Sequence, residues 1–129
     1  IAQRVWKREV IDLDMGYVNQ IWQGDVLAYL ARSFLLCRSP SAVLNMTGPE
    51  TLSVRTLARS IGDLIGIEPI FKGVESEEAL LGNSQELFKW FGFPKVTSSE
   101  IVEWVAWWTL NSRQILDKPT KYESRLGEF

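Results

Sequence analysis

The chain has 129 residues, of which 46% are hydrophobic, and its formal net charge at pH 7 is -2. This length and composition are enough for one domain with a single core. The 14 basic and 16 acidic residues are scattered along the chain, which excludes the basic footprint of a nucleic-acid-binding protein. No apolar run reaches the roughly 18 residues of a membrane-spanning helix, so we expect a soluble, cytoplasmic protein without membrane contact.

The residues that most often carry catalysis or bind metals are scarce. The chain contains one cysteine, Cys37, and no histidine. A single cysteine cannot form an internal disulfide, and the absence of histidine removes zinc sites of the Cys/His type as well as Ser-His-Asp and Cys-His catalysis. We therefore expect no metal in this chain. Because the sequence starts at Ile1 in what reads as the middle of a helix, we also expect it to be a piece of a longer protein.

The first quarter of the chain is predicted to hold two short strands and a long helix. Residues 10–14 (VIDLD) and 17–22 (YVNQIW) read as strands on either side of a turn. Residues 26–37 are apolar at all but two positions, which predicts a helix buried between layers. Asp25 is expected to be its N-cap, a structural role worth about 1 kcal/mol and not a catalytic one.

A strand, a turn and an amphipathic helix are expected next. Residues 42–46 (AVLNM) predict a strand covered on both faces. Gly48 and the proline after it break this strand, and Ser53 is placed to cap a helix that ends at Gly66. The apolar positions of this helix follow one face: Val54, Leu57, Ala58, Ile61 and Ile65.

The last part of the chain predicts an edge strand, two helices and an arm. Residues 67–74 read as a strand, at an edge because of its proline. Residues 83–91 predict a short helix with an asparagine cap. Thr97 begins a capping box for the strongest helix, which should run to about Asn111. Residues 118–129 are expected to form an extended arm.

Three of the six tryptophans lie on that last helix. Trp104 and Trp108 share one face, and Trp107 lies about 100° away from it. Such residues can form a stacking platform for bases or sugar rings, but the spacing favours core packing for the pair and contact with a neighbouring surface for Trp107.

The joint "TGPETLS", which begins at Thr47, raises the question of phosphate binding, because helix N-termini after glycine-rich turns often hold phosphate. It has neither G-x-G-x-x-G nor the lysine of a P-loop, so a plain strand-to-helix turn is favoured. The carboxylate pairs Asp12 with Asp14 and Glu77 with Glu78 are expected to be solvated charge, not a catalytic pair.

The order of the elements resembles the C-terminal part of the extended short-chain dehydrogenase/reductases, the NAD-dependent epimerase/dehydratase family. The segments that carry the resemblance are "IWQGDVLAYLARSFLL", "AVLNMTGPETLSVRTLARSIGDLIG" and "LFKWFGFPKVTSSEIVEWVAWW". The resemblance covers nearly the whole chain. It implies an α/β fold class: a helix-rich substrate-lobe fragment of a Rossmann-type protein, with a few short strands, forming a single lobe over residues 1–129.

The family binds NAD or NADP through an N-terminal Gly-x-x-Gly-x-x-Gly and uses a Tyr-x-x-x-Lys pair for catalysis. Neither motif occurs in this chain. The resemblance therefore implies no catalytic residue and no bound cofactor here, with NAD or NADP held by the rest of a longer protein. It also implies that Gln20, Trp22 and Gln23 face the substrate. Nucleotide-sugar members commonly carry an arginine in this stretch, and "YVNQIWQGD" has none, so a smaller or less charged substrate is equally compatible.

Two functions are left open by the sequence. The first is the substrate-binding part of an NAD(P)-dependent epimerase, dehydratase or reductase acting on a sugar-like or small carbonyl or hydroxyl compound. The second is a non-catalytic interaction module that uses its tryptophan-rich helix. In either case strand 42–46 and helix 26–37 would lack neighbours, so we expect a missing N-terminal Rossmann half, a homo-oligomer, or both, to cover them.

Overall fold

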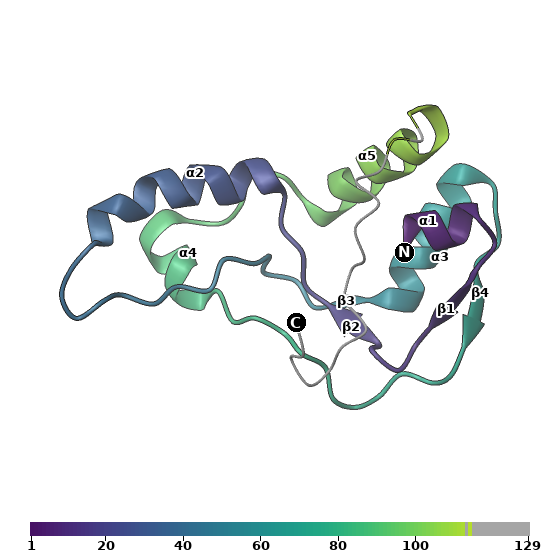
Figure 1. Ribbon diagram of the computed structural model, residues 1–129, viewed down its shortest axis with the longest axis horizontal. Coiled ribbons are helices and arrows are strands. Elements are labelled where there is room, and N and C mark those ends of the chain that lie inside the picture. The colour runs from purple at the N-terminus through teal and green to yellow at the C-terminus, as the bar shows by residue number, and fades with distance from the viewer. Residues whose placement is uncertain (113, 115–129) are drawn as a thin grey trace. The chain divides into compact units, whose positions relative to one another are not determined.

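The computed structural model describes residues 1–112 and residue 114 (Figure 1). The described chain forms two compact units. The first unit contains Ile1–Val18, Thr51–Leu81 and the chain from Ser99 onward, and the second unit contains Asn19–Glu50 and Gly82–Ser98. The predicted arm at residues 118–129 lies outside the described residues, and the single lobe stays a prediction.

The first unit combines short helices with two small sheets. Its elements are α1 (Ala2–Trp6), β1 (Val10–Asp12), β2 (Tyr17–Val18), β3 (Leu52–Ser53), α3 (Val54–Ile65), β4 (Ile70–Lys72) and α5 (Ser98–Asn111). Strand β1 pairs in parallel with β4, and β2 pairs antiparallel with β3. The two N-terminal strands thus exist but do not pair around the turn between them, because each finds its partner in the Thr51–Leu81 segment.

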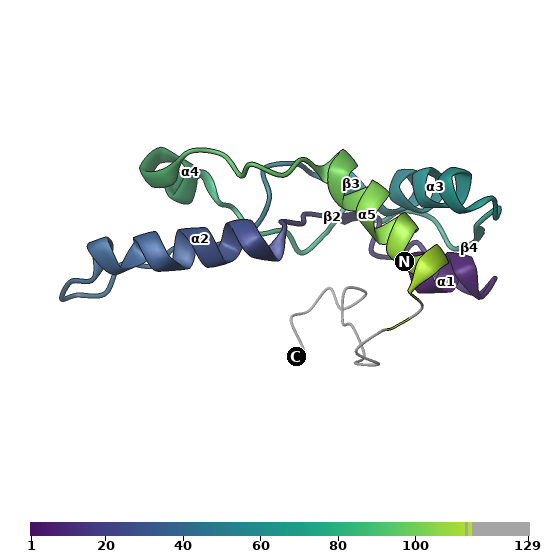
Figure 2. The ribbon, with the colours of Figure 1, turned by 90° about the horizontal axis from the view of Figure 1, so that it is seen from above.

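Helix α3 is the centre of the core of the first unit, and α1 packs beside it (Figures 1 and 2). The Ser53 hydroxyl accepts the backbone N–H of Thr56 at 3.2 Å, which confirms the predicted cap. Gly66 ends the helix with φ at +73°, a conformation that favours glycine. All five predicted apolar positions of α3 are buried, together with residues from α1, from β1 and the residue after it, and from α5: Ala2, Val5, Ile11, Leu13, Val102 and Ala106.

Helix α5 has the predicted length but buries a different face. Val102, Ala106 and Thr109 are buried, whereas Trp104, Trp107 and Trp108 are 44%, 61% and 46% exposed. The prediction of tryptophan in the core is therefore wrong for this chain. The helix is apolar around most of its circumference, and the face with small side chains allows a closer approach to the core than the indole face does.

The second unit is built from α2 (Gln23–Ser33), the 3₁₀ turn η1 (Phe34–Leu36) and α4 (Gln85–Phe91). Helix α4 matches the predicted short helix, with Ser84 at the N-cap position and the Asn83 side chain accepting the N–H of Gln85 at 3.0 Å. Its Leu87 is fully buried.

Helix α2 contradicts the predicted buried helix. Asp25 and Tyr29 are its buried residues, while Leu27 and Leu30 are 56% and 49% exposed. The predicted strand at residues 42–46 is also absent, since these residues have no regular structure. Both differences have one cause: a buried helix and a paired strand need neighbouring layers, and the second unit by itself supplies neither.

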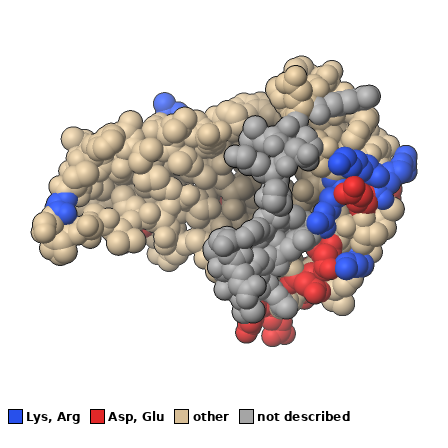
Figure 3. All heavy atoms as spheres, in the orientation of Figure 1, with Lys and Arg blue, Asp and Glu red and all other residues tan. Residues whose placement is uncertain are grey.

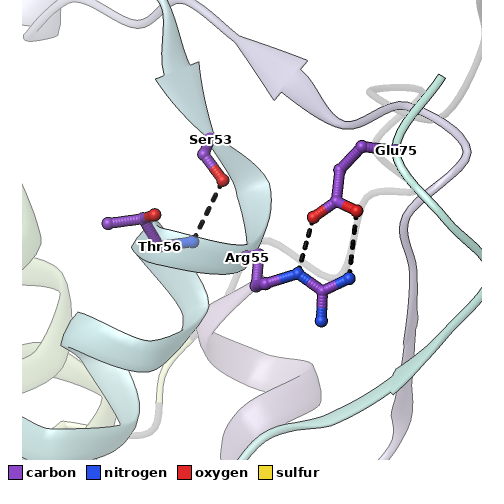
Figure 4. A network of polar contacts seen from close by, with 4 residues as sticks. All are labelled: Ser53, Arg55, Thr56 and Glu75. Atoms are coloured by element: carbon purple, nitrogen blue, oxygen red, sulfur yellow. Dashed lines mark hydrogen bonds and ion pairs between the residues drawn. The ribbon is translucent and has the colours of Figure 1, made fainter. Parts of the chain in front are cut away.

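An ion pair closes the loop after β4 onto the start of α3 (Figure 4). Arg55 donates from Nε to one carboxylate oxygen of Glu75 at 2.6 Å and from Nη2 to the other at 3.0 Å. The same guanidinium lies 5.1 Å from the centre of the Phe71 ring. Hydrogen bonding from Arg55 lowers the pKa of Glu75 to about 2. The bidentate geometry fixes this loop more firmly than a single contact would.

The depressed pKa of Glu75 predicts acid sensitivity. The carboxylate stabilises the fold at pH values above about 4.3, its ordinary pKa, and this contribution is lost as the pH falls toward about 2. We expect Glu75→Gln to lower the free energy of unfolding at pH 7 and to flatten its fall between pH 5 and pH 2. Urea unfolding across this range measures the effect. The exposed Glu78→Gln is the control, and equal pH profiles for the two variants would contradict the prediction.

Candidate functional site

The three predicted substrate-facing residues lie in the second unit, where the chain passes from β2 into α2. Gln20 is half-buried, Trp22 is 42% exposed and Gln23 is exposed. Trp22 occupies the N-cap position of α2. The structure thus places all three in one short stretch, residues 19–25, which we call the polar segment.

The polar segment is backed by the turn that contains Gly48. A Cβ atom added at Gly48 would lie 1.8 Å from the carbonyl oxygen of Gln20, far inside van der Waals contact. Only glycine allows this approach of two backbones. The turn that raised the question of phosphate binding therefore positions the backbone of Gln20.

Side-chain amides and a hydroxyl tie the polar segment and this turn to the start of α4. Asn19 donates to the carbonyl oxygen of Gly82 at 2.7 Å and accepts its N–H at 3.4 Å. The backbone N–H of Thr47 donates to the buried Ser84 hydroxyl at 2.9 Å. These groups are neutral, so the contacts fix geometry without adding charge.

Asp25 does not have the predicted role of N-cap. Helix α2 begins two residues earlier, at Gln23, and the cap position belongs to Trp22. Asp25 lies in the first turn and is buried, and its Oδ2 accepts the backbone N–H of Val96 at 3.0 Å. Its carboxylate still faces the positive end of the helix dipole. Its main partner, however, is a loop 71 residues away in sequence.

The Trp22 indole lies against the first turn of α2. A Cβ atom at Gly24 would lie 2.5 Å from the indole Nε1 and 3.0 Å from Cδ1. A side chain at position 24 would therefore displace the Trp22 ring from this position.

Gln20 carries the chemical feature that sets this stretch apart. Its Nε2 atom is buried, and it has no hydrogen-bond partner among the residues that the structure describes. Leaving a buried donor unpaired costs about 1–3 kcal/mol. Because this atom is closed off from the surface, an acceptor oxygen of a bound molecule reaches it only when neighbouring groups move.

The polar segment carries one carboxylate among neutral hydrogen-bonding groups. The polar segment offers amide, indole and backbone groups, and its carboxylate Asp25 is already engaged with Val96. Within residues 1–112 and 114, no group of three or more Cys, Asp or Glu side chains is placed to hold a metal ion.

Burial raises the pKa of Tyr29, whose hydroxyl donates to the carbonyl oxygen of Gly92 at 2.8 Å.

Sequence reasoning named Gln20, whose role stays a prediction, and it did not point to the residues that hold its backbone in place. Asn19, Gly48 and Ser84 act through backbone contacts with partners more than 25 residues away in sequence. A single glycine in a turn was a usable signal for Gly48, since it marks either a special φ or a close approach. No nearby sequence feature indicated that Asn19 or Ser84 makes these contacts.

Comparison with known proteins supports the fold and little more. No family model matches the chain, and no curated protein matches it. A crystal structure of UDP-galactose 4-epimerase is similar, with a TM-score of 0.58 and 18% sequence identity. The match covers 81% of this chain and 36% of the epimerase chain. This likeness shows the fold.

The predicted fold class is confirmed: the chain is a helix-rich α/β protein with a few short strands that resembles part of a Rossmann-type epimerase. It spans about a third of the length of that structure, as the 36% coverage shows. Among the described residues, every helix is too short or too polar to cross a membrane.

The close approach at Gly48 gives a steric prediction. We expect Gly48→Ala to cost about 1–3 kcal/mol, because the added methyl group must push the Gln20 backbone away. Gly66→Ala is the control. A Cβ atom at Gly66 meets no neighbouring atom, so this variant loses only the free energy of placing alanine at a left-handed φ, about 1–2 kcal/mol.

Urea unfolding and a two-dimensional ¹⁵N–¹H spectrum distinguish the two variants. Gly48→Ala should move the resonances of residues 19–23, while Gly66→Ala should leave them in place. A Gly48→Ala spectrum that is unchanged in this segment would contradict the close approach.

Proposed function

We propose that this chain is the substrate-binding part of an NAD(P)-dependent epimerase, dehydratase or reductase of the extended short-chain dehydrogenase/reductase type. Its substrate is a sugar-like or small carbonyl or hydroxyl compound, which Gln20, Trp22 and Gln23 face. The observation that carries the proposal is the buried Gln20 amide nitrogen, which lacks an acceptor among the described residues. The likeness in fold to UDP-galactose 4-epimerase supports it.

The Gln20 amide N–H group needs an oxygen acceptor. A substrate hydroxyl or carbonyl in this position pairs the buried donor, whereas an analogue without that oxygen leaves it unpaired and binds more weakly. The similar solved structure is named for UDP-galactose. The stretch "YVNQIWQGD" has no arginine for a diphosphate, so we assign the contact to the hydroxyl-bearing part of the substrate.

The reaction itself belongs to the rest of the proposed longer protein. This chain has neither the Tyr-x-x-x-Lys pair nor a histidine, and the turn at Gly48 is occupied by the backbone of Gln20. In the proposal, NAD or NADP is held by an N-terminal Rossmann half, and this chain supplies the substrate contacts.

A cofactor titration tests this division of labour. The 129-residue chain should bind neither NAD nor NADP, because its sequence has no Gly-x-x-Gly-x-x-Gly motif to let a backbone reach a pyrophosphate. Calorimetric titration with each nucleotide is the measurement. Binding in the micromolar range by this chain would contradict the proposal.

The apolar face of the second unit is where we propose that partners bind. Leu27, Leu30, Phe34 and Leu35 are between 49% and 86% exposed. The face of the second unit seen in Figure 3 carries few charged side chains, whereas charged side chains gather on the first unit. An uncharged apolar surface of this kind favours coverage by another layer, either the N-terminal half or a second copy of the chain.

Association of the isolated chain follows from that face. We expect a dimer or a higher oligomer, because two copies can cover each other's α2 and pair the backbone of residues 42–46. Light scattering over a range of protein concentrations measures it. A well-folded monomer at every concentration would show that the chain needs no cover.

One observation favours the second function, an interaction module. Trp107 is 61% exposed, so its indole can contact a partner. The coding sequence upstream of this chain separates the two functions. A Gly-x-x-Gly-x-x-Gly and a Tyr-x-x-x-Lys there would support the enzyme, and their absence would favour the module.

A further inference from the structure

The segment Gly82–Ser98, which contains α4, is joined to the rest of the second unit by several hydrogen bonds and has few buried side chains. Ser84 and Leu87 are its buried residues. The first unit, by contrast, has a continuous apolar core around α3. A segment with few buried apolar contacts and several hydrogen bonds opens at lower free energy than such a core. We call Gly82–Ser98 the strap.

The two ends of the strap are tied to the two ends of the polar segment. At the first end, Asn19 exchanges two hydrogen bonds with Gly82. At the other end, Asp25 accepts the N–H of Val96. Gln20, Trp22 and Gln23 lie between these ties, so the strap spans the residues that face the substrate in the proposed function.

The middle of the strap contacts α2 and not the polar segment. The Tyr29 hydroxyl donates to the carbonyl oxygen of Gly92, and Arg32 donates to the carbonyl oxygen of Phe91 at 3.0 Å. The Phe91 ring also stacks with Tyr29 and lies under the Arg32 guanidinium. Because these contacts join the two ties through one short helix, release at one end loosens the other.

We infer that Asn19 and Asp25 are positioning residues that couple closure of the strap to the placement of the Gln20 amide. The inference rests on the proposed function of Gln20. The closed strap holds both ends of the polar segment and so fixes the position of Gln20 Nε2, which donates to the substrate oxygen in the proposed function. By reciprocity, a molecule that binds the ordered segment also favours the closed strap.

Amide hydrogen exchange of the ligand-free chain tests the coupling between the ends. Asp25→Ala should speed exchange of the Gly82 amide, at the far end, by about tenfold, as expected for loss of one partly buried hydrogen bond. Asn19→Ala should do the same to the Val96 amide. Asp25→Asn, which keeps an acceptor oxygen, should restore slow exchange at Gly82.

Ser33→Ala is the matched control, because it removes a side-chain bond to the Leu30 carbonyl within α2 and touches no tie. The amides of α3 report that the first unit remains folded. If each variant changes exchange only at its own end, the strap does not act as one element and the inference is overturned.

Galactose, as a probe rich in hydroxyl groups, separates this inference from the proposed function. Galactose that shifts the Gln20 side-chain amide resonance should also slow exchange at Gly82 and Val96, and a shift without slower exchange overturns the inference. If galactose causes no shift while the two ends stay coupled, the inference holds for the strap and the proposed role of Gln20 is wrong.

Discussion

The second unit depends on one close contact, in which the Gly48 backbone lies against the carbonyl group of Gln20 with no room for a side chain. This contact fixes where the polar segment can lie. The hydrogen bonds from Asn19 to Gly82 and from Thr47 to Ser84 then hold the segment before α4 beside the polar segment and the Gly48 turn. A unit with few buried apolar side chains is thus ordered by sterics and polar contacts more than by a hydrophobic core.

The two units differ in where their apolar side chains lie. In the first unit, the apolar stripe of α3 meets α1, β1 and the small-residue face of α5. In the second unit, the apolar side chains of α2 stay exposed and its two buried residues, Asp25 and Tyr29, reach backbone groups of the strap. The exposed apolar face accounts for the proposed need for another layer, and the amide groups of the polar segment account for the proposed substrate.

Sequence reasoning succeeded where a feature is local. The Ser53 cap, the apolar face of α3 and the left-handed Gly66 depend on residues within a few positions of each other, so spacing alone predicts them. It failed where the outcome depends on distant partners. Asp25 reads as a cap but bonds to Val96. The spacing on α5 favours burial of its tryptophan pair, whereas the face with Val102 and Ala106 is the buried one. Burial of α2 was predicted from composition, which does not reveal whether a covering layer is present.

The central claim is that Gln20 presents a buried donor to a hydroxyl-bearing or carbonyl-bearing molecule. The most direct measurement is the position of the Gln20 side-chain amide resonance during titration with galactose and with UDP-galactose, with Gln20→Leu used to assign the signal. The account predicts a saturable shift of this resonance with at least one of the two compounds. Shifts confined to the indole N–H groups of α5, or no shift at all, would contradict it.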